Sequence, residues 1–172
     1  LKADNWAYSG DFEGGVFHGS GELLRENGTG FRGEFAKGVP QSGTLFLQGK
    51  RRFKGDIRKS GTSLTLNGEL SGPGERIDEG RFRDGFVSAK TGLIPEASLK
   101  RFGQHRIQHS DGTLEKAVFR DGVREGRGRL ELPEGDTLLV KWRDGEVVYQ
   151  APGPDTIAQR ASDNTCRVES DT

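Results

Sequence analysis

The chain has 172 residues, enough for one domain or two very small ones, and its 27 glycines are about twice the usual share. Only 31% of the residues are hydrophobic, yet ten phenylalanines and two tryptophans argue against a disordered chain, since disordered chains are poor in aromatic residues. Twenty-six basic and 26 acidic residues give zero net charge, which argues against a general nucleic-acid binder.

The ends and the compartment are less defined by the sequence. No apolar run reaches the roughly 18 residues of a membrane span. The chain begins at Leu1 and contains no methionine, so we expect its natural N-terminus to lie further upstream. The single Cys166 forms no internal disulfide and says little about redox environment. The localisation stays open between cytoplasmic and membrane-associated.

A pattern of two aromatic residues separated by x-Gly-x recurs along the chain. Its first copy, at residues 8–15, reads YSGDFEGG and continues to Leu23, and the second begins 23 residues later. Complete or partial copies occupy residues 8–23, 31–38, 53–57, 80–85, 119–130 and 138–145. A period near 23 residues, with alternation inside each unit, predicts a stack of β-hairpins.

The alternation also predicts which residues form the core. In a strand, Tyr8, Gly10 and Phe12 lie on one face, and the bare glycine backbone lets a neighbouring ring lie on it. We therefore expect these rings to pack over the glycines of neighbouring repeats. The predicted core rings are Tyr8, Phe12, Phe31, Phe35, Phe53, Phe82, Phe119 and Trp142.

Two segments interrupt the period. Phe82 and Phe119 are 37 residues apart rather than 23, which predicts an irregular insert at about residues 86–112 within a repeat domain spanning residues 1–150. Residues 151–172 are polar and begin with two prolines, so we expect a flexible C-terminal tail with a short helical turn after Asp155.

The repeat resembles that of the MORN-repeat family. Residues 8–23 match the family pattern Y-x-G-x-W-x-x-G-x-x-x-G-x-G-x-L throughout if Phe12 stands for tryptophan, and residues 119–130 match its second part. The resemblance covers about residues 6–148, with a break. It implies an all-β, elongated single-layer solenoid of stacked antiparallel β-hairpins. It also implies a non-catalytic scaffold that binds protein partners or itself, or that accompanies a larger enzyme as an accessory domain.

No residues suggest catalysis, and we expect neither cofactor nor metal. The glycines of residues 28–33 formally fit G-x-G-x-x-G, but they belong to a hairpin turn and a strand. His105 and His109 lie four residues apart near Asp111, and a metal there would need further ligands. We therefore expect two solvated strand histidines.

The strongest binding signal is a basic cluster, Lys50, Arg51, Arg52 and Lys54. Such a cluster favours an anionic partner, so peripheral binding to anionic, phosphoinositide-like membrane lipids is the alternative function. The competing interpretation is a soluble strand edge protected by its charges. A looser cluster in the insert comprises Lys100, Arg101, His105 and Arg106, and the rings outside the core pattern, candidates for exposed contacts, are Phe17, Phe46, Phe86 and Phe102.

Overall fold

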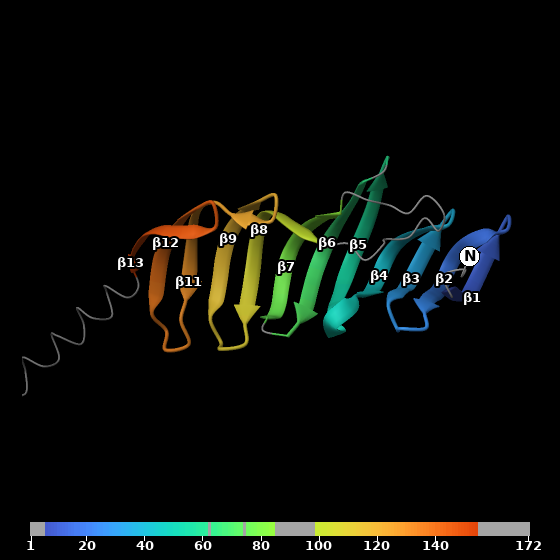
Figure 1. Cartoon of the computed structure of the whole chain (residues 1–172), viewed down its shortest axis with the longest axis horizontal. Helices are drawn as coiled ribbons and strands as arrows, with labels where there is room; N and C mark the ends of the chain where they lie inside the picture. Colours follow the sequence, from blue (N-terminus) through green and yellow to red (C-terminus); the bar gives the residue numbers. More distant parts are fainter. Residues whose placement is uncertain (1–5, 62, 74, 85–98, 155–172) are drawn as a thin grey trace, which may run out of the picture.

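The computed structural model describes residues 6–61, 63–73, 75–84 and 99–154. They form one open antiparallel sheet of 13 strands in which consecutive strands are neighbours, apart from the short β10, which pairs with β9 (Figure 1). The predicted all-β stack of hairpins is therefore confirmed. The elements are β1 (Trp6–Glu13), β2 (Val16–Arg25), β3 (Gly30–Ala36), β4 (Val39–Phe46), η1 (Gln48–Lys50), β5 (Arg52–Ser60), β6 (Ser63–Gly72), β7 (Glu75–Asp84), β8 (Lys100–His109), β9 (Leu114–Arg120), β10 (Val123–Arg124), β11 (Gly126–Glu131), β12 (Thr137–Arg143) and β13 (Glu146–Pro152).

A row of glycines crosses the first seven strands. Each glycine lies directly opposite the next, in the order Gly10, Gly21, Gly33, Gly43, Gly55, Gly68 and Gly80, and His105 and then Ala117 extend the row on β8 and β9. At Gly33, where φ is 157°, a Cβ atom would lie 2.7 Å from the Gly43 Cα and 2.9 Å from the Phe31 ring. The backbones and the ring thus occupy the space that a side chain would need.

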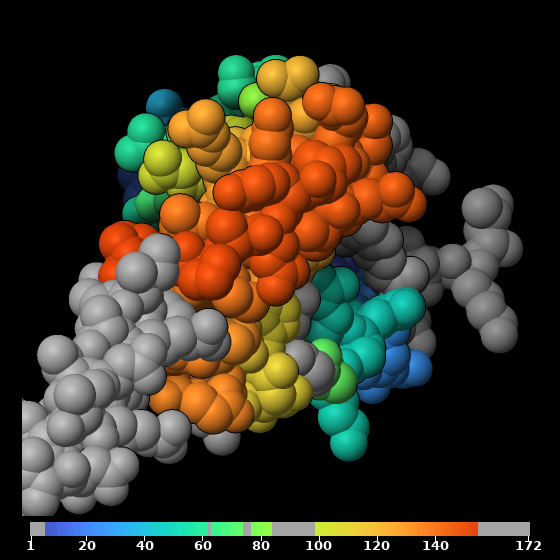
Figure 2. All heavy atoms as spheres, turned by 90° about the vertical axis from the view of Figure 1, so that its left-hand side faces the viewer, coloured from blue at the N-terminus to red at the C-terminus, as the bar shows by residue number. Residues whose placement is uncertain are grey.

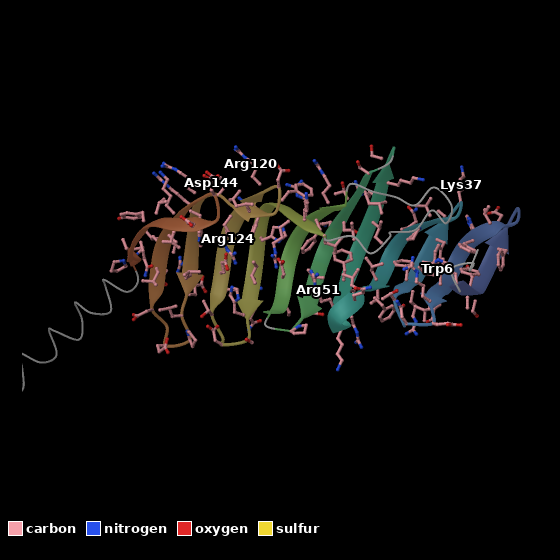
Figure 3. The ribbon with its side chains drawn as sticks, in the orientation of Figure 1. Trp6, Lys37, Arg51, Arg120, Arg124 and Asp144 are labelled. Carbon is pink, nitrogen blue, oxygen red and sulfur yellow. The ribbon has the colours of Figure 1, made fainter. Side chains whose placement is uncertain are left out.

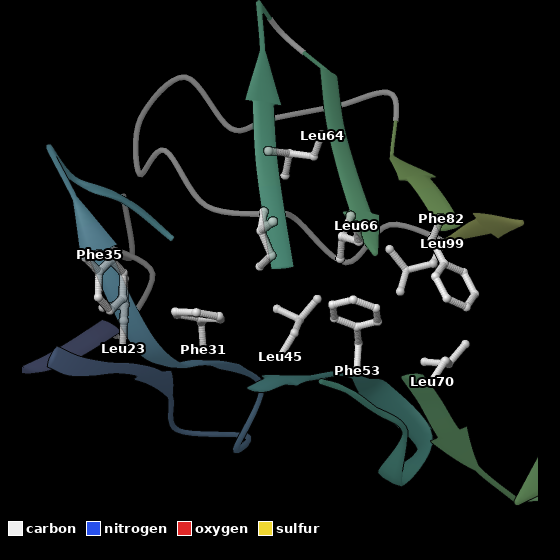
Figure 4. Close-up of a cluster of buried hydrophobic side chains, with 11 residues drawn as sticks. Leu23, Phe31, Phe35, Leu45, Phe53, Leu64, Leu66, Leu70, Phe82 and Leu99 are labelled. Carbon is white, nitrogen blue, oxygen red and sulfur yellow. The ribbon is translucent and has the colours of Figure 1, made fainter. Parts of the chain in front are cut away.

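The strands bend at this row, and the bend creates the core. Phe31 and Phe35 lie four residues apart on β3, a separation of about 13 Å in a straight strand, yet their ring centroids are 5.2 Å apart. Figure 4 shows the result: Leu64 points from one half of the sheet towards Phe31 and Phe53 on the other. A single bent sheet therefore buries apolar side chains without a second layer.

The core contains most of the predicted rings. Six of them, Phe31, Phe35, Phe53, Phe82, Phe119 and Trp142, are buried. Tyr8 is partly buried and stacks on Phe17 at 3.9 Å between centroids. The prediction is wrong for Phe12, which is 61% exposed, because β1 is the first strand of the sheet and no described repeat covers it.

The boundaries also need correction. Residues 100–109, inside the predicted irregular insert, form β8, which pairs along its length with β7 and β9. The pattern hid this strand because His105 occupies the glycine position of the row. Residues 85–98 lie outside the described residues, as do the end of the predicted tail and its helical turn, while β13 continues to Pro152. Within the described residues no helix is long and apolar enough to cross a membrane.

Candidate interaction surfaces

Three of the four residues of the predicted basic cluster, Lys50, Arg51 and Arg52, lie around one groove, and Lys54 does not. Lys50 ends η1, Arg51 follows it and packs beside Gly72, and Arg52 begins β5. These three residues line a groove of about 760 Å³ between η1 and the turn at residues 27–29, with Arg51 visible beside η1 in Figure 3. Lys54 does not line this groove and lies opposite Glu69 on β6. None of the four cations forms an ion pair with another described residue.

The second basic cluster is divided between the two faces of β8. Lys100 and Arg106 are exposed, whereas Arg101 and His105 point towards the core. Arg101 donates a hydrogen bond from Nε to Asp78 Oδ2, and His105 Nδ1 lies 2.6 Å from Asp78 Oδ1. The cluster is therefore not a charged loop, because strand alternation separates its members.

Asp78 is a fully buried acid that sequence reasoning missed. It occupies the same register position as Leu70 on β6 and faces Ile107 on β8. His105 completes the group: its side chain is fully buried, its Nε2 lies 2.8 Å from the Arg81 carbonyl oxygen, and its ring contacts Phe82 and Phe119 edge-on. The prediction of a solvated His105 is wrong. The inward alternation of Asp78 on β7 was the available signal.

A second acid, Glu115 on β9, is buried in the same register row. Arg124 donates hydrogen bonds to both of its carboxylate oxygens, and His109 Nε2 lies 2.8 Å from Oε2. Burial alone would raise the pKa of Glu115, but the bonds from Arg124 and His109 outweigh it, so the pKa lies below its ordinary value. Arg101 and Arg124 also both lie over the Phe119 ring, at 5.5 and 5.3 Å.

The three residues weighed as metal ligands are held by different partners. His105 is bound to Asp78, His109 to Glu115, and the Asp111 carboxylate accepts a hydrogen bond of 2.8 Å from the Thr113 amide. Among the described residues, no group of three or more histidine, cysteine, aspartate or glutamate side chains could hold a metal ion.

The remaining rings take part in packing. Phe17 lies between Tyr8 and Phe35, and Phe102 lies under Arg81 and Arg83 at 5.1 and 4.8 Å. Phe46 likewise lies under Arg32 and Arg52. Each of the three is partly buried, and Phe86 is outside the described residues. The predicted contact rings are therefore largely occupied within the chain.

Apolar side chains gather at the C-terminal end of the sheet. We call Val123, Leu139, Val147, Val148 and Tyr149 the C-terminal apolar edge; all five are large hydrophobic residues that remain exposed. Three of them lie on β13, which pairs with β12 on one side and has no described strand on the other. Figure 2 looks onto this end, where the orange and red strands face the viewer.

Comparison with known proteins agrees with the repeat geometry. No curated protein matches the chain. The model of the MORN repeat family matches residues 8–30, which cover β1 and β2, and residues 118–137, which include β10 and β11. Both matches fall on hairpins with the ring and glycine pattern described above. The chain therefore contains MORN repeats at residues 8–30 and 118–137.

Proposed function

We propose that the chain is a non-catalytic scaffold that associates with a second copy of itself, or with a protein partner, through strand β13. MORN repeats occur in repeat scaffolds and in membrane-binding and protein-binding proteins, and the family is generally non-catalytic. The observation that carries the proposal is the C-terminal apolar edge on a terminal strand.

An exposed apolar edge strand is unusual in a protein that acts alone. Unpaired backbone groups on such a strand template pairing with another chain, and monomeric proteins usually protect them with charges, prolines or bulges. In β13 the only charge is Glu146, the only proline is Pro152 at its last position, and a register irregularity falls at Val148. Val147, Val148 and Tyr149 follow one another at 54, 50 and 59% exposure. A strand added here would gain backbone hydrogen bonds and bury these side chains, as in recognition by β-augmentation.

We expect Val148→Lys to abolish or weaken self-association without unfolding the sheet. A lysine on the edge carries charge into the new interface, which opposes strand pairing. Sedimentation velocity over a range of protein concentration measures the change, and we expect the dissociation constant to rise by about tenfold or more. The matched control is Val16→Lys, since Val16 is similarly exposed at the opposite end of the sheet. A wild-type chain that stays monomeric at all concentrations, or equal effects of both variants, contradicts the role of β13.

The groove beside η1 supports a second candidate function, binding to anionic lipid headgroups. Lys50, Arg51 and Arg52 gather there without acidic partners among the described residues, and each cation near an anionic membrane contributes about 1 kcal/mol. We expect the chain to sediment with vesicles containing phosphatidylserine more than with neutral vesicles at low salt, and Lys50→Gln with Arg52→Gln to remove the difference. Equal sedimentation with both vesicle types contradicts this function.

A further inference from the structure

A groove of about 650 Å³ lies over strands β6 to β11, on the face of the sheet opposite the core (green to orange in Figure 1). Four cations line it, Arg106, Lys116, Arg127 and Arg129. They face away from the core because the neighbouring positions on β8 and β9, such as Ile107 and Ala117, are buried. We call this hollow with its four cations the basic groove.

The register places the cations side by side. Arg106 lies directly opposite Lys116, and Lys116 lies directly opposite Arg129, so three adjacent strands present a cation in one row. Arg127, one row away, lies opposite another cation, Lys141. Like charges in directly opposed positions destabilise a sheet. These strands therefore maintain an unfavourable arrangement that a bound anion would relieve.

In the N-terminal half of the sheet, the same row places acidic residues opposite basic ones. There Glu22 lies opposite Arg32 and forms an ion pair with it, and Lys54 lies opposite Glu69. Acids do reach the basic groove from its rim: Glu79 Oε2 is 3.9 Å from Arg106, and Glu131 Oε1 is 3.0 Å from Lys116. Glu131 Oε1 also lies 3.5 Å from Arg129 Nε, so two acids face the four cations, and Arg127 has no ion pair with any described residue. The groove keeps an excess of positive charge.

The floor of the groove suits a polypeptide chain. The backbones of Gly68, Gly80 and Gly128 form part of its lining, between side chains that point out of the sheet. Gln104 offers an amide, and Val118, 38% exposed, offers an apolar contact between the cations. Adjacent strands are about 4.8 Å apart and same-face side chains of an extended peptide about 7 Å apart, so successive carboxylates of a peptide crossing the strands can each reach an arginine or lysine.

Nucleic acid fits the groove less well than an acidic peptide. Single-stranded nucleic acid binds with bases stacked on aromatic rings, and the described residues that line the groove include no phenylalanine, tyrosine or tryptophan.

We propose that the basic groove binds an extended acidic segment of a protein partner. The inference rests on the scaffold function proposed above and specifies the chemistry of one partner. It does not depend on β13, because the basic groove and the C-terminal apolar edge lie on the same sheet but share no residue.

The proposal predicts how a model acidic peptide binds. We expect fluorescein-labelled decaglutamate to bind the full chain in an anisotropy titration, more weakly as salt rises, and decalysine not to bind. Replacing Arg106→Gln and Arg127→Gln together should weaken binding by about tenfold or more, since two charge-assisted contacts are lost. The matched control is Arg58→Gln with Arg120→Gln, two exposed arginines outside the groove.

A thermal melt of each variant separates binding from folding. Removing cations that face other cations should leave the melting temperature unchanged or raise it, so a loss of peptide binding in a chain at least as stable as wild type identifies the groove. Repeating the titration with Val148→Lys separates this proposal from self-association, because a monomeric variant should still bind the peptide.

Several results would overturn the proposal. These are wild-type affinity in the groove variant, an equal loss in the control variant, or no binding of decaglutamate by the wild-type chain at low salt. Oligothymidine or phosphatidylserine vesicles that bind as tightly as decaglutamate, with the same dependence on Arg106 and Arg127, would show a general polyanion site instead.

Discussion

Gly33→Ala should destabilise the sheet by at least about 3 kcal/mol, because strained backbone and overpacking act together at this position. The new Cβ would lie 2.7 Å from the Gly43 Cα and even closer to the Ser42 carbonyl oxygen. Both atoms are backbone in a paired strand, so neither can turn aside as a side chain would. The Phe31 ring fills the remaining direction.

Gly49→Ala is the matched control for this result. Gly49 also has a positive φ, 68°, but nothing lies within 4 Å of its Cβ position. Alanine there should lower the free energy of unfolding only by the cost of a left-handed backbone conformation, about 1–2 kcal/mol. Urea unfolding followed by circular dichroism gives both free energies. Because repeats contact mainly their neighbours, hydrogen exchange should show the loss concentrated in the first hairpins. Equal destabilisation by the two variants would mean that close packing along the glycine row does not hold the sheet together.

The same glycine row explains how much of the fold the sequence could predict. Rings and glycines recur at a fixed spacing because the strands bend at the glycine row and bury apolar side chains on their inner face, so the period carries the architecture. The pattern failed where the row changes residue type. At His105 a ring replaces glycine, so the period alone predicts an irregular insert where the structure has β8. At Phe12 the pattern is intact, but periodicity does not reveal that a terminal strand lacks a neighbour.

The interaction surfaces were less predictable than the fold. Lys50 to Lys54 are neighbours in sequence, but Lys54 lies further along β5 than Arg52, on the same face and outside the groove. Arg106, Lys116 and Arg129 are separated by 10 and 13 residues, and they meet because of the register of β8, β9 and β11. That register is set by the turn between β8 and β9 and by the connection through β10, so the three cations meet only when the strands pair.

Asp78→Leu should be as damaging as the glycine substitution, costing about 3–5 kcal/mol, because it removes the buried hydrogen-bond partner of the Arg101 guanidinium and the His105 ring. The Asp78 and His105 side chains are fully buried, and that of Arg101 is 22% exposed. The size of leucine is not the difficulty, since Leu70 occupies the same register position on β6. Chemical unfolding measures the cost. Glu79→Leu, at an exposed acid next to Asp78 on the same strand, is the control and should change stability by less than about 0.5 kcal/mol.

Restoring the apolar composition of the other repeats should reverse the loss. In a triple variant, Asp78→Leu, Arg101→Leu and His105→Ala, no charge stays buried, and alanine already occupies the next position of the row at Ala117. Replacing a buried ion group by apolar side chains is commonly neutral or stabilising, so the triple variant should approach or exceed wild-type stability. A triple variant no more stable than Asp78→Leu would show that the group stabilises the sheet by itself.

The position of Asp78, Arg101 and His105 indicates a role in strand register, which the group can have even if it adds nothing to stability. Most neighbouring strands are joined by tight turns that set their register, but β7 ends at Asp84 and β8 begins at Lys100. Asp78 bonds both Arg101 and His105 across this pair of strands, and its bonds are satisfied in one register. A slip by one residue would move Asp78 to the opposite face from its partners. The buried acid therefore selects the pairing that places Glu79 and Gly80 of β7 beside Arg106 and His105 of β8, and with it the β7 side of the basic groove.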